Sequence, residues 1–580
     1  MLSRALKITV LLLCLLLSLT ACADNGGEDH TLLIYMCGSD LESSRGYASQ
    51  NLEEILSANL PKNVNIVIQT GGSESWHNPN ISSEHIGRYE VKNSKLTQLS
   101  SLQQENMGDG ETLLSFLNFA KDSYPSDKTS LILWDHGGGT LGGVCFDENY
   151  GLDSLSLNEL EYALDEANID FEFIGFDACL MATYDTANSV KSFAKYMIAS
   201  EELEPASGWD YKALLENLSS EDFYTEVLAS YAKRQSAKTY YTLSVIDLSG
   251  MARVDKAIDD IIKSINSDIS QLTTALEDTI FFGTNEVSKS DTNLLDLCLF
   301  ARSLGIECDF SDFIKTVGGS ARADATGLSI YFPAKNEYDE AEYLEISKNS
   351  KYTDFLSAYT GRIPENPIVF DLDGFINNGR LSFSLTEQSL KYVQSVSYEL
   401  HIYSDSGNEI MYYVGEDNDI TRQHALYTVN FSGEWVYLND LLLHCNILEE
   451  NERYTLFYAP VIIEDEYCYL IFSYIAPTKR FITEGYVDAG DIGSRINPLT
   501  SGCEITVIYE ISDGTEEITY YEEGTVIFGS DTQISKKPLE ADYYQCVPRV
   551  TDILGNEYYG KTAIIHFDGE KSVIESLSAG

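Results

Sequence analysis

The first half of the chain alternates two kinds of segment, and this alternation constrains the fold more than any other feature. Short, continuously apolar runs are separated by longer segments with helical spacing, such as the one that contains Leu113, Leu117 and Ala120. Strands that are apolar on both faces are typical of a parallel sheet covered by helices. We therefore predict an α/β sandwich with a mostly parallel sheet and right-handed crossovers. The predicted strands are Thr31–Met36, Asn65–Gln69, Ser130–Trp134, Phe173–Phe176, Tyr196–Ala199, Thr242–Ile246 and Leu328–Phe332, and the predicted helices are Leu52–Leu56, Thr112–Lys121, Leu157–Ala167 and Leu180–Val190.

The pattern changes after Pro364-Glu365-Asn366-Pro367. Helical spacing fades, and strand-like runs rich in Tyr, Val, Ile and Phe recur between Asp-Gly, Asn-Gly and Ser-Gly dipeptides. This texture predicts an antiparallel β region of one or two sandwich-like modules. We expect an α/β domain over residues 31–363 and a β-rich region over residues 368–580.

The N-terminus carries a targeting segment. Arg4 and Lys7 precede an apolar run from Ile8 to Leu19, which has the form of a secretory signal. The run ends in Leu19-Thr20-Ala21-Cys22, which resembles the lipobox of bacterial lipoproteins. The resemblance implies a signal peptide over residues 1–21, a tether over residues 22–30, and an exported chain held at the bacterial cell surface by lipid on Cys22. The alternative is an ordinary signal peptide with a chance cysteine.

The charge of the chain excludes one class of partner. The sequence has 38 basic and 91 acidic residues, a formal net charge of −53. Binding to nucleic acid needs a basic face that displaces counterions from phosphates, so no nucleic-acid partner is expected. Adhesion to anionic lipid through a basic surface is disfavoured for the same reason.

The cysteines give little indication of a metal or redox site. There are 11, and none forms a Cys-x-x-Cys pair, so zinc ribbons and thioredoxin-like chemistry are unsupported. Without Cys14 and Cys22 the count is odd, which predicts at least one free thiol. Cys445 with Cys468, or Cys503 with Cys546, are candidate pairs in the β region.

Two predicted strands run directly into residues that can carry chemistry. One reads Leu131-Ile132-Leu133-Trp134-Asp135-His136-Gly137-Gly138-Gly139, and the other reads Phe173-Ile174-Gly175-Phe176-Asp177-Ala178-Cys179-Leu180-Met181. Active sites of open α/β sheets gather at the carboxyl ends of strands, so His136 and Cys179 should face one crevice. We also expect Cys179 to open a helix, whose N-terminus favours the thiolate. The pair predicts a Cys–His nucleophilic site.

These motifs resemble the clostripain family of cysteine peptidases, which shares a clan with caspases, legumains and gingipains. The resemblance covers roughly Thr31 to Tyr359 and implies a caspase-like α/β sandwich with peptidase activity. Besides the two strand ends it rests on Leu33-Ile34-Tyr35-Met36, Asp40-Leu41-Glu42, Ser200-Glu201-Glu202-Leu203-Glu204-Pro205, Gly208-Trp209 and Gly327-Leu328-Ser329-Ile330-Tyr331-Phe332-Pro333.

The resemblance also implies roles for single residues. Cys179 would attack the scissile carbonyl while His136 transfers protons, and the N–H groups of Gly137 and Cys179 would hold the oxyanion. Clostripain-like enzymes cut after basic residues through two acids in the substrate pocket. Asp177 matches the first acid, and Asp210 is the candidate for the second. Protein or peptide substrates with basic residues follow as the expected partners.

One departure concerns processing. Family members are often activated by cleavage after a basic residue between the His and Cys motifs. Here no Lys or Arg occurs between Lys128 and Lys191. We expect a single-chain enzyme, or one processed elsewhere.

Calcium is the one cofactor under consideration. The chemistry itself requires no cofactor, but some members of the family need Ca²⁺. Asp147, Glu148 and Asp153 are candidate ligands, although the DxDxDG spacing is absent and a solvated acidic loop is the simpler interpretation.

The motifs give less support to other functions. His136-Gly137-Gly138-Gly139 also resembles the oxyanion loop of lipases, but the chain has no Gly-x-Ser-x-Gly elbow. It also has no HExxH metallopeptidase motif. A catalytically inactive surface lipoprotein that binds protein or glycan remains the open alternative.

Overall fold

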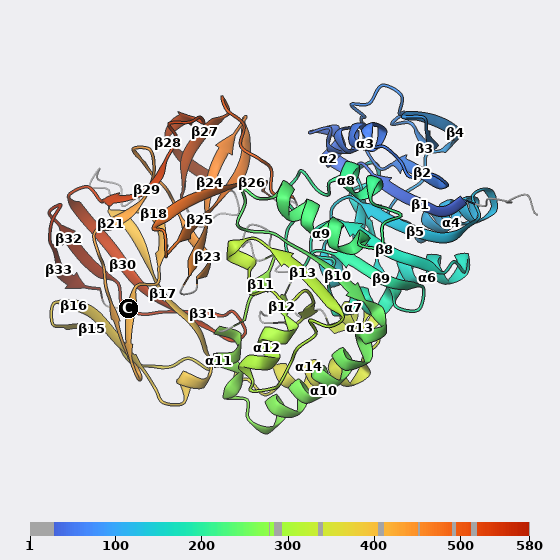
Figure 1. Cartoon of the computed structure of the whole chain (residues 1–580). Helices are drawn as coiled ribbons and strands as arrows, with labels where there is room; N and C mark the ends of the chain where they lie inside the picture. Colours follow the sequence, from blue (N-terminus) through green and yellow to red (C-terminus); the bar gives the residue numbers. More distant parts are fainter. Residues whose placement is uncertain are drawn as a thin grey trace, which may run out of the picture.

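The computed structural model describes residues 28–277, 279–283, 293–333, 340–403, 411–450, 453–489, 495–511 and 519–578. The predicted signal peptide and Cys22 lie outside these residues. An α/β part and a β-rich part lie side by side, with β26 (Arg480–Asp488) near the boundary between them (Figure 1).

The α/β part is built on one nine-stranded sheet with the order β13-β10-β9-β8-β5-β1-β2-β3-β4. Its five central strands are parallel, as predicted, and antiparallel strands extend it at both edges. The parallel strands are β1 (Glu28–Cys37), β2 (Val64–Gly71), β5 (Ser126–Trp134), β8 (Phe171–Asp177) and β9 (Ala194–Ala199), and the antiparallel ones are β3 (His85–Lys92), β4 (Lys95–Gln103), β10 (Thr242–Asp247) and β13 (Ile314–Gly318).

Alternate side chains of the central strands enter two separate cores. In β1, Leu33 and Tyr35 belong to one core, whereas Leu32 and Ile34 belong to the other. This alternation is the period-2 geometry of a strand buried on both faces. One face is covered by α4 (Gly110–Ser123), α6 (Leu157–Ala167), α7 (Tyr184–Val190) and α10 (Met251–Ser267), and the other by α3 (Tyr47–Ser57), α8 (Tyr211–Glu216) and α9 (Phe223–Arg234).

Two predicted strands differ from the expected parallel arrangement. Thr242–Ile246 corresponds to β10, which pairs antiparallel with β9. Leu328–Phe332 contains β14 (Ser329–Tyr331), which belongs to a separate three-stranded sheet, because it pairs with β12 rather than with the main sheet. The remaining elements of this part are α2 (Ser39–Ser43), α5 (Gly139–Gly142), β6 (Val144–Asp147), β7 (Asp153–Leu155), α11 (Gln271–Glu277), β11 (Phe281–Phe282), β12 (Leu294–Asp296), α12 (Leu297–Ser303), α13 (Glu340–Ile346) and α14 (Ser350–Thr360).

The C-terminal part consists of antiparallel sheets, in agreement with the predicted texture. Its sheets have the orders β15-β16-β20-β19, β18-β17-β30-β32-β33, β22-β21-β29 and β26-β25-β24-β27-β28. The strands are β15 (Phe370–Asn377), β16 (Arg380–Leu385), β17 (Val393–Tyr403), β18 (Met411–Asp417), β19 (Ile420–Gln423), β20 (Leu426–Val429), β21 (Glu434–Leu438), β22 (Leu441–Leu442), β23 (Asn446–Glu450), β24 (Tyr454–Ile463), β25 (Glu466–Ile475), β27 (Glu504–Ile511), β28 (Thr519–Ile527), β29 (Ile534–Pro538), β30 (Asp542–Asp552), β31 (Glu557–Tyr559), β32 (Ala563–Phe567) and β33 (Ser572–Leu577).

The boundary between the two parts is a continuous core rather than a linker. Tyr454, Val487 and Ile496 from the β-rich part are buried in the same apolar cluster as Cys179. Buried Arg322 lies 2.8 Å from Glu202 and 2.7 Å from Glu449, so an ion-pair network also crosses the boundary. Separating the parts would expose both the apolar side chains and these charges.

The cysteine pairing differs from the expected one. Cys298 of α12 is bonded to Cys308, whereas the four cysteines considered as partners in the β region are free and buried. Among the helices that the structure describes, none is both long and apolar enough to cross a bilayer.

Candidate active site

The two reactive strand ends lie next to each other. Strands β5 and β8 are parallel neighbours, with Trp134 paired to Asp177. His136 and Cys179 each follow two residues after this pair, so both extend from the same edge of the sheet. The turns that follow are in contact, because a Cβ placed on Gly137 would lie 2.1 Å from the carbonyl oxygen of Cys179. Only glycine fits at residue 137.

Cys179 does not open a helix, which corrects the expectation from sequence. Helix α7 begins at Tyr184, and Cys179 lies in the preceding turn, where Leu180 has φ +64°. The Cys179 thiol is fully buried and its Sγ accepts a hydrogen bond from the N–H of Glu204 at 3.1 Å. Burial raises the pKa of Cys179 to about 12, against a partial opposing effect of Arg495. The thiol is therefore neutral in this conformation.

His136 is paired with an acid whose role sequence reasoning missed. Its Nε2 lies 2.7 Å from Oδ1 of Asp40, which belongs to α2 at the end of β1. Burial opposes ionisation of Asp40, but the charge of His136 and the hydrogen bonds that Asp40 accepts together outweigh burial and lower the pKa of Asp40. The sequence signal at this residue is Asp40-Leu41-Glu42, which contributes to the family resemblance but does not indicate a role for Asp40.

Two buried acids, Glu42 and Asp135, hold the turn that carries Asp40. Glu42 accepts hydrogen bonds from the N–H of Ser49 at 2.8 Å and from the N–H of His77 at 2.6 Å. Asp135, beside the histidine, accepts from the hydroxyl of Ser39 and from the N–H of Phe146. These hydrogen bonds fix the backbone of the turn, and the backbone in turn fixes the position of the Asp40 carboxylate.

Asp177 lies in a buried pocket that contains an arginine from the β-rich part. The Nη2 of Arg495 donates to Oδ1 of Asp177 at 3.0 Å and to the carbonyl oxygens of Asp135 and Asp177. Its guanidinium stacks on the ring of Trp134 at 5.0 Å, and neither Arg495 nor Asp177 has exposed surface. Burial would lower the pKa of Arg495, but the charges of Asp177 and Glu204 outweigh it and raise it.

The second acid of this pocket is Glu204. Burial and the charge of Asp177 raise the pKa of Glu204 well above its usual range, and Arg495 opposes them. Glu204 Oε1 also accepts from the indole of Trp209 at 3.2 Å. Gly208 also borders the Arg495 guanidinium, because a Cβ at this residue would lie 2.6 Å from Nη1 of Arg495. We call the space bounded by Trp134, Asp177, Glu204 and Gly208 the arginine pocket.

Asp210, the acid singled out from sequence, has a different position. It is the N-cap of α8, and its Oδ1 accepts from the N–H of Ala213 at 2.9 Å. That bond satisfies a free N–H at the start of the helix. Among the described contacts of Arg495, none involves Asp210.

Comparisons with known proteins show the family of the chain. A model described as the clostripain family matches residues 34–357, more than half of the chain. The chain belongs to the clostripain family. Clostripain of Hathewaya histolytica is 24% identical over 327 residues, 48% of this chain and 56% of the relative, so the match spans about half of that curated protein.

Several solved structures also resemble this member of the clostripain family. One is a secreted C11 cysteine protease from Bacteroides thetaiotaomicron in complex with an irreversible peptide inhibitor. It has a TM-score of 0.44 and 16% identity, covering 57% of this chain and 99% of that chain. Another is an inactive zymogen C11 protease from Parabacteroides distasonis, with a TM-score of 0.39 and 19% identity, covering 57% and 95%.

The candidate calcium ligands of this clostripain-family chain are engaged in loop contacts. Asp147 accepts from the N–H of Met107 at 2.7 Å, and Glu148 accepts from the N–H of Glu74 at 2.8 Å. Asp153 accepts from the side-chain amide of Asn106 at 2.5 Å. Within the described residues, no three His, Cys, Asp or Glu side chains gather in a way that would hold a metal ion.

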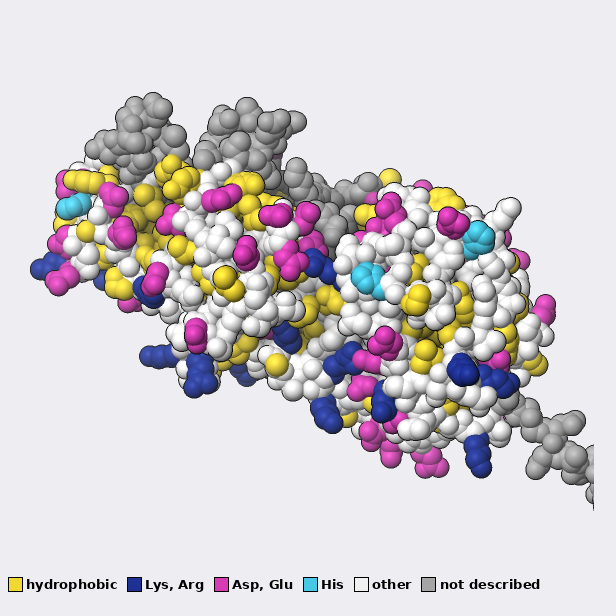
Figure 2. All heavy atoms as spheres, turned by 90° about the horizontal axis from the view of Figure 1, so that it is seen from above, with side chains coloured by type: hydrophobic (Ala, Val, Ile, Leu, Met, Phe, Trp, Pro, Cys, Tyr) yellow, Lys and Arg dark blue, Asp and Glu magenta, His cyan; other side chains and the backbone are white. Residues whose placement is uncertain are grey.

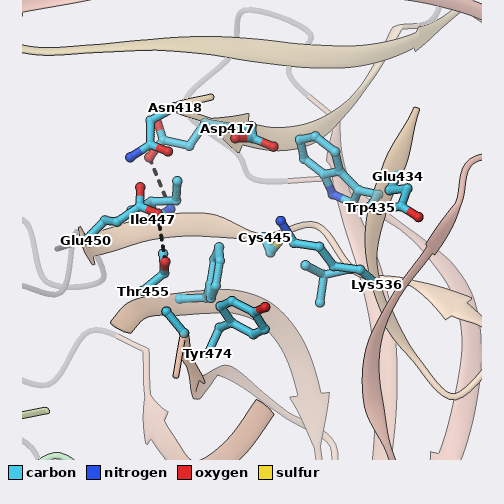
Figure 3. Close-up of a pocket in the computed structure, with 14 residues that line it drawn as sticks. Asp417, Asn418, Glu434, Trp435, Cys445, Ile447, Glu450, Thr455, Tyr474 and Lys536 are labelled. Carbon is cyan, nitrogen blue, oxygen red and sulfur yellow. Dashed lines mark hydrogen bonds between the residues drawn. The ribbon is translucent and has the colours of Figure 1, made fainter. Parts of the chain in front are cut away.

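A pocket lies in the β-rich part, away from the family's motifs (Figure 3). Its lining includes Asp417, Trp435, Glu450 and Lys536, and it contains neither His136 nor Cys179. On the face drawn in Figure 2, acidic side chains are scattered over both parts of the molecule. The basic side chains of this face lie mainly toward one edge.

Proposed function

We propose that this chain is a cysteine endopeptidase that hydrolyses peptide bonds after arginine or lysine. The observation that carries the proposal is the arginine pocket, where a guanidinium meets Asp177 at 3.0 Å beside the turn of Cys179. Charge-assisted bonds of this kind in a dry pocket select cationic side chains strongly. Membership of the clostripain family supports the same reaction class.

In the proposed mechanism Cys179 is the nucleophile. His136 accepts the thiol proton as the sulfur attacks the scissile carbonyl and forms a C–S bond. The C–N bond then breaks as His136 passes that proton to the leaving amine. His136 then takes a proton from the water that hydrolyses the thioester. The Asp40 carboxylate, 2.7 Å from Nε2, orients the imidazole and stabilises its cationic form.

The oxyanion is assigned to backbone donors. The N–H groups of Gly137 and Cys179 belong to the two turns that touch at the edge of the sheet, and this proximity supports their sharing one oxygen. Glu204 is assigned as the acid that joins Asp177 in binding the basic side chain. Its buried position beside Arg495 supports this choice over Asp210.

The proposed setting is outside the cytoplasm. Lipid on Cys22 would anchor the exported chain at the bacterial cell surface, where its partners are proteins or peptides with basic residues. The Cys298–Cys308 disulfide is compatible with an oxidising compartment. The reaction is proposed to need no metal in its chemical steps, and activity measured with and without a calcium chelator tests whether Ca²⁺ supports the fold.

The decisive experiment uses purified residues 23–580 and a peptide library read by mass spectrometry. We expect cleavage after Arg and Lys only, and none by Cys179→Ala. Cleavage after other residues would refute the assignment of the arginine pocket. If neither protein cleaves any peptide, and an arginine acyloxymethyl ketone labels neither after long incubation, the inactive binding protein is favoured.

A further inference from the structure

The arginine pocket is filled by a side chain of the same molecule. Arg495 is 318 residues from Asp177 along the chain, so the contact is purely tertiary. The guanidinium occupies the position that the proposed function gives to the basic side chain of a substrate. Arg495 therefore competes directly with any substrate for Asp177.

The backbone after Arg495 is bound along the peptidase part like an added strand. The N–H of Ile496 donates to the carbonyl oxygen of Glu204 at 3.2 Å, and the N–H of Ala206 donates to the carbonyl oxygen of Ile496 at 3.0 Å. Ile496 pairs with Pro205 and is buried in the core cluster that contains Cys179. Extended peptides are commonly recognised in this way, by main-chain bonds plus side-chain pockets.

The next residue holds the segment from the other side. Asn497 exchanges two backbone hydrogen bonds with Tyr486 of β26, at 3.0 and 2.8 Å. Its side chain accepts from the hydroxyl of Tyr47 at 3.1 Å and donates to Asp488 at 3.0 Å. Residues 495–497, which we call the plug, are thus held between α3, the turn 204–206 and β26.

The plugged conformation closes the site. Cys179 has no exposed surface and His136 is 4% exposed. The plug is nevertheless an incomplete ligand. Among the described side chains, Oδ2 of Asp177 and Oε2 of Glu204 have no hydrogen-bond partner, and neither do Nε and Nη1 of Arg495. Buried polar atoms without partners are costly, so the fit of Arg495 in the arginine pocket is not optimal.

We propose that the plug is an internal inhibitor that keeps the peptidase latent by placing Arg495 in its own substrate pocket. The inference rests on the proposed function. A peptidase whose open form is only a fraction f of the population binds substrate with an affinity reduced by that fraction, so a plug closed ~99% of the time would weaken apparent binding ~100-fold.

The test compares labelling rates of Cys179 in the full mature chain by an arginine acyloxymethyl ketone. Arg495→Ala removes the competing side chain and should raise the second-order rate constant at least ~10-fold. Asn497→Ala loosens the plug without touching the pocket and should raise the rate by a smaller factor. Arg480→Ala, an exposed arginine at the other end of β26, is the matched control and should label like the wild type.

The outcomes separate this inference from the proposed function. Wild type, Arg495→Ala and Asn497→Ala could all label at the same rate, with no labelling of Cys179→Ala. In that case the proposed peptidase function stands and the proposed inhibition by the plug is refuted. If none labels, the proposed function fails first. Should Arg495→Ala misfold by circular dichroism, Asn497→Ala decides alone. Unchanged labelling of a folded Asn497→Ala then overturns the plug.

Discussion

Nε2 of His136 lies 2.7 Å from Oδ1 of Asp40, although 96 residues separate the two in sequence. The hydrogen bond to the carboxylate holds the imidazole in one orientation. We expect Asp40→Asn to lower kcat ~100-fold with little change in KM, because in the proposed mechanism Asp40 acts through His136. Exposed Asp122→Asn is the control. An unchanged kcat in Asp40→Asn would remove Asp40 from the proposed mechanism.

The same pair predicts a pH dependence of stability. The pKa of Asp40 is lowered from 3.8 in the folded protein, so its ionised form stabilises the fold. That contribution is present above pH 3.8 and is lost as the pH falls through the lower folded pKa. The difference in free energy of unfolding between wild type and Asp40→Asn, measured in urea, should therefore shrink as the pH falls below 3.8. A difference that grows would contradict the ion pair.

Gly208 makes room for the guanidinium, so substitution there should block the pocket. A Cβ at this residue would lie 2.6 Å from Nη1 of Arg495 and 2.9 Å from Oδ1 of Asp177, and its φ is +55°. We expect Gly208→Ala to lower kcat/KM for arginine substrates by ~100-fold or more. Gly529→Ala, which meets no atom within 4 Å, should leave it unchanged.

Three acids can be ranked by their effect on specificity. Asp177→Asn should lower kcat/KM for arginine peptides most, because its oxygen contacts the guanidinium at 3.0 Å. Glu204→Gln should cost less, because burial and Asp177 raise the pKa of Glu204 and so favour a neutral acid. Asp210→Asn should leave specificity intact. Asp210→Ala should destabilise the chain by ~1 kcal/mol through the lost helix cap. A specificity change in Asp210→Asn would restore the prediction made from sequence.

Arg322 should be the largest single electrostatic contributor at the boundary. It is fully buried between Glu202 and Glu449. Arg322→Ala leaves both acids without their cation and should destabilise the chain by ~3–5 kcal/mol in urea unfolding. Arg453→Ala removes an exposed pair with Asp324, also across the boundary, and should cost less than ~1 kcal/mol. Equal effects would mean that burial does not govern this interface.

The sheet and the two strand ends were predictable because their signals are local. Continuous apolar runs located β1, β5 and β8. His136 and Cys179 directly follow β5 and β8, which placed both residues at one edge of the sheet. Residues 157–167 were predicted as a helix and form α6. The antiparallel direction of β10 was not predictable, because an apolar strand reads alike in both directions.

The acids of the site could not be ranked from sequence. Glu204 and Asp210 are six residues apart, and only tertiary packing turns one into the pocket and the other onto a helix N-terminus. Arg495 had no local signal at all, since its partner is 318 residues away. The prediction that Cys179 opens a helix was wrong because Leu180 adopts a positive φ, and a leucine in the sequence gives no sign of that conformation.

The shared core sets an order for the making of the protein. Tyr454, Val487 and Ile496 complete the apolar cluster around Cys179, so this cluster cannot close until the ribosome has delivered almost the whole polypeptide. A chain interrupted in the β-rich part would present an unfinished apolar surface instead of a smaller peptidase. Folding of the earlier residues around Cys179 thus depends on synthesis of the last part of the chain.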